Sequence, residues 1–255
     1  MENLNETKEG KEMNRRPKVI CHMTTSLDGK VTGGFLGMPE CERATEVYYE
    51  INRSYHADAY ACGRVTMEGS FTGGWFPQLR AYQGERIPRE DYAADQDAHF
   101  FAVAFDRKGR LGWRTSCIVD EDPGYGGAHI IEVMLEDVSD AYLAYLRETG
   151  VSYIFAGRNE MDIELALEKL RSLFGIETLL LEGGSIINGA FARAGMIDEL
   201  SLVIAPVTAD AADKPLLMDA LPQAYDLTGV KQYDGGVVWM NCIAKRKTAE
   251  NGFGK

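Results

Sequence analysis

The sequence predicts a single α/β domain whose mixed, mostly parallel sheet is flanked by helices. Apolar strand-like runs alternate with amphipathic helical runs along most of the 255 residues, as in folds that cover a parallel sheet on both faces. The last two strand-like runs, 225–233 and 237–245, are joined by Asp234 and Gly235, a pair that favours a tight hairpin. We therefore expect an antiparallel hairpin at the C-terminal end of the sheet.

The other strands are expected where short apolar or β-branched runs stand between turn-forming residues. These runs occupy residues 18–23, 58–62, 99–105, 115–119, 129–134, 152–156, 178–181 and 200–207. Residues 71–97 are rich in glycine, proline and charge, and we expect them to form a long loop.

Helices are expected at residues 43–56, 65–70, 139–149, 162–174 and 185–194. The clearest is 162–174, whose acids lie at its start and whose bases lie at its end, as the helix dipole favours. Gly175 and Gly195 stand where two of these helices should stop.

The composition is ordinary for a globular protein, with 45% hydrophobic and 26% charged residues. We assign residues 17–246 to one domain and expect disordered tails at 1–16 and 247–255. The net charge of −12 disfavours nucleic acid as a partner. No apolar run has the length of a membrane span, and the first residues lack the apolar core of an export signal, so we expect a cytoplasmic protein. The five cysteines form no C-x-x-C pair, so a metal site is not indicated.

The strongest candidate site is a double glycine that separates an apolar strand from a helix. Ligands of open α/β sheets bind beyond the carboxyl ends of the strands. Glycines let the backbone approach a ligand closely, and the free N–H groups at a helix start favour an anion such as a dinucleotide pyrophosphate. A plain tight turn into a helix is the alternative. The candidate cofactor-binding residues here are Gly183, Gly184, Ser185, Ile186, Ile187 and Asn188.

Three further strand ends carry glycine or cations. In a chain this acidic, arginines at several strand ends indicate a bound anion, and two adjacent cations could select the 2′-phosphate of NADP. Taken alone, Arg64 with Thr66 and Arg107 with Lys108 are better explained as surface residues of a solvated turn. The residues are Gly63 and Arg64 followed by Thr66, then Gly157 and Arg158, and Arg107 with Lys108.

The segment 24–30, after the first strand, is dense in hydroxyl groups and carries Asp28 before Gly29. It could close over a nicotinamide and a substrate as a mobile loop, with Asp28 as a polar catalytic contact. An Asp-Gly pair is also a common turn.

Together these residues resemble the reductase family of bacterial riboflavin biosynthesis, the RibD C-terminal-like domain, which has a dihydrofolate reductase-like fold. Residues 25–30, Thr-Ser-Leu-Asp-Gly-Lys, look like the S-L-D-G-K/R segment of that family. Residues 181–191, Leu-Glu-Gly-Gly-Ser-Ile-Ile-Asn-Gly-Ala-Phe, together with the Ala-Pro pair at 205–206, resemble its C-terminal signature. The resemblance spans about residues 17–245.

The resemblance implies an NADPH-dependent reductase that converts the ring-opened ribose of a ribosylaminopyrimidine phosphate to a ribityl chain. By position it implies that Thr25, Thr66, Arg107 and the stretch 184–190 contact NADPH. It also implies that Glu182 faces the substrate, which makes Glu182 a second candidate catalytic residue. The cofactor would carry the chemistry, and the protein would orient the reactants and exclude water. The resemblance also implies a small-molecule substrate. A homodimer is expected as well, because members of this family often pair through their sheets.

The chain departs from the family pattern in two places. Full family enzymes carry a zinc deaminase domain with H-x-E and P-C-x-x-C motifs, and neither motif occurs here, so deamination is not expected. Residues 66–75 depart from the family segment T-x-x-x-D-D-P-x-L-T-x-R, which holds a substrate-phosphate arginine, so the substrate stays open. A pterin reductase using Glu46 or Glu50 of the helix 43–56 is one alternative, and a non-catalytic NADP-binding protein is another.

Overall fold

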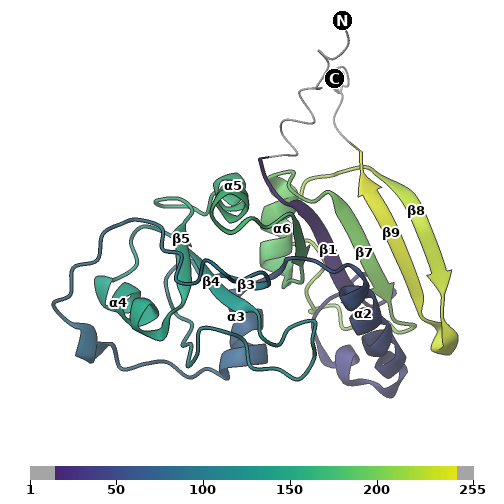
Figure 1. Cartoon of the computed structure of the whole chain (residues 1–255). Coiled ribbons are helices and arrows are strands. Elements are labelled where there is room, and N and C mark those ends of the chain that lie inside the picture. Colours follow the sequence, from purple (N-terminus) through teal and green to yellow (C-terminus); the bar gives the residue numbers. More distant parts are fainter. Residues whose placement is uncertain (1–14, 246–255) are drawn as a thin grey trace, which may run out of the picture.

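Nine strands form one sheet in the order β5-β4-β3-β2-β6-β1-β7-β9-β8 (Figure 1). The computed structural model describes residues 15–245. The strands are β1 (Lys18–Thr25), β2 (Ala59–Gly63), β3 (Phe101–Phe105), β4 (His129–Met134), β5 (Ser152–Phe155), β6 (Thr178–Leu181), β7 (Glu199–Ile204), β8 (Tyr225–Gln232) and β9 (Val238–Ala244).

Neighbouring strands from β5 to β7 pair in parallel, whereas β9 runs antiparallel to both β7 and β8. This arrangement confirms the predicted fold class, including its C-terminal hairpin. Because the parallel strands share one direction, their carboxyl ends meet at one edge of the sheet. The α-helices are α2 (Glu42–Ser54), α3 (Arg64–Met67), α4 (Asp140–Thr149), α5 (Ile163–Phe174) and α6 (Ser185–Arg193).

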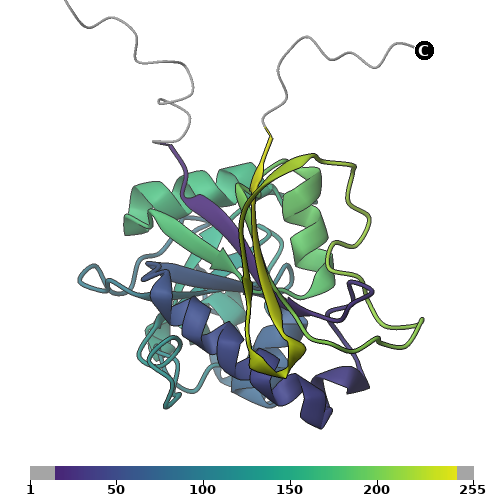
Figure 2. The ribbon, with the colours of Figure 1, turned by 90° about the vertical axis from the view of Figure 1, so that its right-hand side faces the viewer.

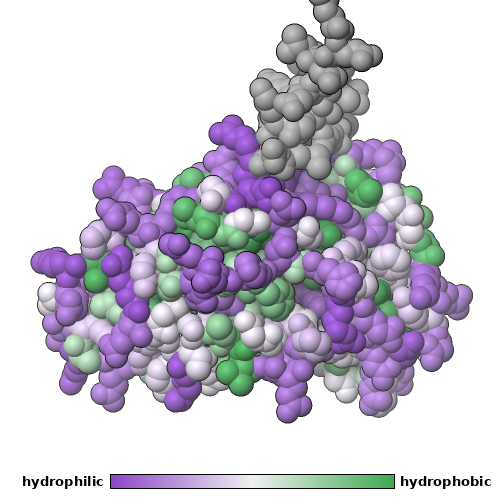
Figure 3. All heavy atoms as spheres, viewed as in Figure 1, coloured by the Kyte–Doolittle hydropathy of each residue, from purple (hydrophilic) through white to green (hydrophobic). Residues whose placement is uncertain are grey.

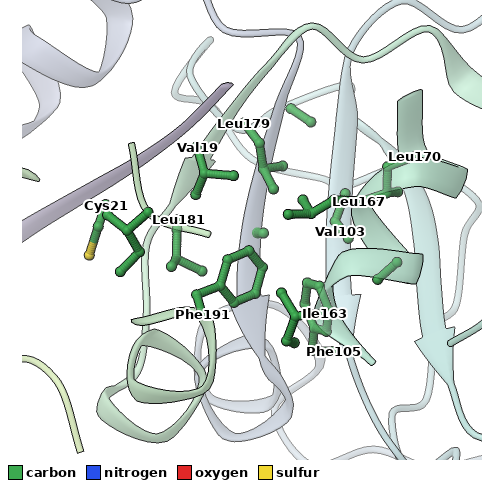
Figure 4. Packing of buried hydrophobic residues seen from close by; sticks show 14 of the residues in the cluster. Val19, Cys21, Val103, Phe105, Ile163, Leu167, Leu170, Leu179, Leu181 and Phe191 are labelled. Atoms are coloured by element: carbon green, nitrogen blue, oxygen red, sulfur yellow. The ribbon is translucent and has the colours of Figure 1, made fainter. Parts of the chain in front are cut away.

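The helices cover both faces of the sheet, with α5 and α6 on one side and α2 and α4 on the other (Figures 1 and 2). Under α5 and α6, the ring of Phe191 meets that of Phe105 at 5.3 Å between centroids, and Ile163 lies beside them (Figure 4). Side chains alternate between the faces of a strand. Leu181 of β6 therefore faces α5 and α6, and Leu180 faces the opposite side. The next residue along, Glu182, lies on the side of α2.

One predicted strand was wrong. Residues 115–119 form only an isolated bridge, between Cys117 and His129. The reason is spatial: β4 already occupies the position beside β3, and the glycine-rich turn that follows brings the chain back into β4 itself.

The predicted tails lie mostly outside the described residues, which begin at 15 and end at 245. Arg16 lies in the described part, where its guanidinium donates two hydrogen bonds of 2.7 Å to Asp198. Among residues 15–245, no helix combines the length and the apolar character needed to span a membrane. The face shown in Figure 3 is mostly hydrophilic, with small separated apolar patches, as the acidic composition leads one to expect.

Candidate active site at the carboxyl edge of the sheet

The ends of β2 and β6 meet directly. The backbone N–H of Gly63 donates to the carbonyl of Gly183 at 2.7 Å, and Glu182 N–H donates to Ala61 at 2.9 Å. A Cβ added to Gly63 would make an ordinary contact with Ile187, at 3.4 Å, so the end of β2 also lies against the first turn of α6. Two of the strand ends that the sequence singles out therefore form one corner.

The N-terminus of α6 at this corner has no side-chain cap. Ser139 caps α4 and Asp162 caps α5, each by accepting a backbone N–H, whereas α2 and α3 begin without a side-chain cap, as α6 does. Uncapped N–H groups at a helix start carry a partial positive charge and bind anions well. A Cβ added to Gly184 would meet only the Thr66 hydroxyl, at 3.4 Å. The corner is thus a cradle of bare backbone with one hydroxyl beside it, and a phosphate group fits it.

Of the side chains that follow Gly184, some point into the protein and one points to its surface. Ser185 donates its hydroxyl to the carbonyl of Pro215, and Asn188 donates to that of Leu216 at 3.3 Å. Both are buried, so their side chains fix α6 against the segment 215–218. The backbone N–H of Asn188 donates to Gly184 and the carbonyl of Ser185 accepts from Met218, which leaves the N–H of Ser185 for a cofactor. Ile186 points outward and is 63% exposed.

Arg64 stands at the corner but is paired. Its Nη1 lies 2.7 Å from the carboxylate of Glu68, one helical turn on. This pair is half-exposed, where ion pairs contribute little to stability. Arg64 can therefore exchange Glu68 for an incoming anion at small cost.

Exposed aliphatic side chains surround the cradle. Leu27, Val65 and Ile186 follow the adjacent strands β1, β2 and β6, and all three are more than 60% exposed. A group of exposed apolar residues around a few polar groups is typical of ligand sites. Such a rim suits a ligand that combines flat rings with phosphates.

The predicted cations at β3 and β5 form a separate group on the same edge. Arg107 donates to the carbonyl of Asn159 at 3.1 Å, so the ends of β3 and β5 meet each other across β4. β3 is two strands from β6, roughly 10 Å, and β5 is four strands away, roughly 19 Å. The structure therefore does not bring Gly157 and Arg158 to the glycine corner. Arg158 reaches only Glu136, at 3.9 Å.

Thr25 and Asp28 lie at the end of β1. Thr25 is buried beside the corner. Asp28 belongs to a turn in which its carboxylate accepts from Ser26 at 2.7 Å and from the backbone of Ala209 at 3.0 Å. These hydrogen bonds lower the pKa of Asp28, so it is a poor proton donor at neutral pH. In the same turn, the backbone N–H of Leu27 donates to the carbonyl of Val207 at 2.7 Å.

Glu182 occupies the other side of the same corner. It is 7% exposed, and its Oε1 accepts a hydrogen bond of 2.6 Å from the side-chain amide of Asn52 on α2. Burial raises the pKa of Glu182 to about 7, against the opposing effect of nearby donors on Tyr48, Asn52 and Tyr125. A carboxyl group that titrates near neutral pH at a strand end is a candidate for proton exchange with a ligand.

The helix carboxylates of the pterin-reductase alternative do not face this site. Glu46 and Glu50 are exposed and pair with Arg43, at 2.9 and 3.2 Å. The polar residues that α2 directs at the site are instead Tyr48 and Asn52, which our sequence analysis did not single out. Their spacing of four residues puts both side chains on one face of the helix, and this pattern could have identified them from the sequence.

The described part of the chain has two notable cavities, and neither coincides with the glycine corner. One, of about 1100 Å³, lies at the opposite, amino-terminal edge of the sheet, and Arg16, Glu168 and Tyr225 are among its lining residues. A smaller one of about 470 Å³ lies beside Asn52 and Tyr60, on the side of the sheet that Glu182 faces. The chemistry of the strand ends, rather than cavity volume, therefore identifies the candidate site.

Comparison with known proteins places this geometry in a family. The family model described as RibD C-terminal domain matches residues 17–239. A curated relative from Methanothermobacter thermautotrophicus, named 2,5-diamino-6-ribosylamino-4(3H)-pyrimidinone 5′-phosphate reductase, is 26% identical over 206 residues. That match covers 80% of this chain and 84% of the relative.

Solved structures share the fold. A pyrimidine reductase-like protein from Corynebacterium diphtheriae superposes with a TM-score of 0.65 at 17% identity, over 92% of this chain and 94% of that one. The riboflavin biosynthesis reductase Rib7 of Saccharomyces cerevisiae gives 0.57 at 17% identity, over 95% and 93%. The family match confirms the resemblance drawn from residues 25–30 and 181–191. This protein belongs to the RibD C-terminal domain family.

Proposed function

We propose that this protein is an NADPH-dependent reductase that converts the ring-opened ribose of a ribosylaminopyrimidine phosphate to a ribityl chain. The name of the Methanothermobacter relative supports this class of substrate. The observation that carries the proposal is the uncapped start of α6, which lies on the same strand end as the buried Glu182. One corner then offers an anion site and a titratable carboxyl group together.

The residues of the corner divide the work of binding. The backbone N–H groups of residues 184–187 hold the pyrophosphate, the Thr66 hydroxyl donates a further hydrogen bond, and Arg64 adds charge. The exposed aliphatic rim covers the rings. When bound, NADPH supplies the hydride.

Glu182 is the proton donor in this proposal. Adding a hydride to carbon requires a proton on the neighbouring heteroatom of the substrate. With a pKa of about 7, Glu182 is protonated in a large fraction of molecules at neutral pH and can supply that proton. In its ionised form it accepts hydrogen bonds from substrate hydroxyl or ring N–H groups.

Binding of NADPH over NADH tests the cofactor. Arg107 and Lys108 are our candidates for the 2′-phosphate, although Lys108 also forms an ion pair with Asp137. At a hundred times its dissociation constant, a ligand stabilises the folded protein by about 2.7 kcal/mol. We expect NADPH to raise the melting temperature and NADH to raise it less. The absence of a shift with either cofactor would refute the reductase proposal.

The substitution Gly184→Val tests the position of the pyrophosphate. The added side chain has room beside Thr66 in the free protein, but it fills the cradle. The variant should fold and lose the NADPH-induced thermal shift. Gly37→Val, at an exposed position where an added Cβ meets nothing within 4 Å, is the matched control and should keep the shift. Unchanged NADPH affinity in Gly184→Val would show that the pyrophosphate does not bind at Gly184.

We also propose that the chain forms a homodimer through its C-terminal hairpin. β8 is an edge strand of the sheet, and it exposes Leu227 and Val230, at 60% and 59%. Unpaired edges with apolar side chains favour association. Sedimentation should report a dimer that Val230→Lys converts to a monomer. A monomeric wild-type protein would contradict this.

A further inference from the structure

An asparagine is buried on the apolar face of α2. Asn52 is 4% exposed, and the other buried residues of this helix are Ala44, Val47 and Ile51. Asparagine is a poor helix former, and a buried amide costs free energy unless it is hydrogen-bonded. An apolar residue would serve helix packing better, so the contacts of Asn52 should reveal why an amide stands there.

Asn52 is held on two sides. Its Nδ2 donates to Oε1 of Glu182 at 2.6 Å, a short charge-assisted length. Its Oδ1 lies against the backbone of Gly124, where any side chain would clash with it. The loop that carries Gly124 is fastened to α2 by the ion pair between Arg53 and Asp122, at 2.7 Å. The amide is therefore clamped between that loop and Glu182.

We propose that Asn52 is a positioning residue, which binds one oxygen of Glu182 and so leaves the other oxygen to exchange a proton with the substrate. This inference rests on the proposed reductase function. Because Nδ2 is a donor, Oε1 must accept, and the acidic proton of Glu182 then resides on Oε2. Tyr48 and Tyr125 are further hydrogen-bond donors near Glu182, and the Asn52 amide is the donor bound to Oε1, so it favours the proton on Oε2.

The other groups around Glu182 do not compete for this proton. Burial raises the pKa of Cys21 to about 12 and holds the pKa values of Cys62 and Tyr48 well above their ordinary ranges. Burial likewise raises the pKa of Tyr125. These thiols and hydroxyls stay protonated at neutral pH. The remaining acid, Asp122, is paired with Arg53.

Two variants of Asn52 separate positioning from packing. Asn52→Leu keeps the volume and removes the donor. We expect its kcat to fall about a hundredfold, the cost of a misplaced catalytic group, while the Kd for NADPH stays unchanged. Asn52→Asp can donate only when the new carboxyl group is protonated, so its activity should recover as the pH falls. Glu46→Gln, on the exposed face of the same helix, is the control and should keep the wild-type pH profile.

A titration without substrate makes the test independent of the proposed function. The carboxyl ¹³C signal of Glu182, assigned with Glu182→Gln, should titrate with a midpoint near the pKa of about 7. In Asn52→Leu the midpoint should move to higher pH, because the ionised form has lost a donor. An unmoved midpoint, or an Asn52→Leu variant with full kcat, would overturn the inference. A shifted midpoint in a protein that oxidises no NADPH would support the contact and refute the reductase.

Discussion

Glu132 and Glu182 are both buried on the same side of the sheet, but their surroundings differ. Glu132 lies in the middle of β4 beneath α4, and it is fully buried. It accepts from the indole of Trp113 and, at 3.4 Å, from the hydroxyl of Tyr142, while its Oε2 has no partner. Glu182 lies past the end of β6 beside the uncapped helix, and an amide binds it.

This difference gives the two carboxyl groups different roles: Glu132 is part of the packed core, and Glu182 can exchange a proton at the site. Burial, with the nearby Asp106, raises the pKa of Glu132 well above its ordinary range, so this carboxyl group stays protonated. Burial raises the pKa of Glu182 only to about 7, so this group changes charge near neutral pH. A buried carboxylate does not by itself mark a site. Its place at a strand end and its near-neutral pKa do.

The largest effect should come from removing the acid at the site. We expect Glu182→Gln to lower kcat by about 10²–10⁴, the usual contribution of a general acid, with the Kd for NADPH unchanged. The matched substitution Glu132→Gln should leave kcat unchanged. Steady-state assays with NADPH measure kcat for both variants. An equal loss of kcat in the two would contradict the different roles of the two carboxyl groups.

The pH dependence of stability should carry the signature of Glu182. Between its ordinary pKa of 4.5 and the folded value of about 7, the folded protein holds a proton that the unfolded chain has released. The free energy of unfolding therefore falls as the pH rises through this window, by roughly 3 kcal/mol for this group. Glu182→Gln should remove that fall and be more stable than wild type above pH 7. Parallel urea-unfolding curves for the two proteins across this window would contradict the raised pKa.

A smaller effect is expected around Glu132. Trp113→Phe leaves the buried carboxyl group without its indole donor and should lower the free energy of unfolding by about 1–3 kcal/mol. Glu132→Gln, which resembles the protonated acid in shape, should change it by less, because a neutral group replaces a neutral group. Chemical denaturation measures both, and a larger loss in Glu132→Gln would mean that Glu132 is ionised.

Most of the fold could be predicted because local patterns agreed with the sheet. The strand Thr178–Leu181 and the helix stop at Gly175 lie where the sequence predicts them. The strand 115–119 could not be excluded, because pairing partners are decided by the whole sheet. At the site, the double glycine and Glu182 were visible as a strand end. The role of Asn52 could not be predicted, because its hydrogen-bond partner, Glu182, lies 130 positions away in the chain.

Transfer of deuterium tests the central account most directly. Wild-type protein, NADPH deuterated at its transferable position and a ribosylaminopyrimidine phosphate should give a product with deuterium at the first carbon of the ribityl chain. Gly184→Val and Glu182→Gln should each give little product, the first by losing the cofactor and the second by losing the proton. A wild-type protein that binds NADPH and transfers no deuterium to the sugar would contradict the account.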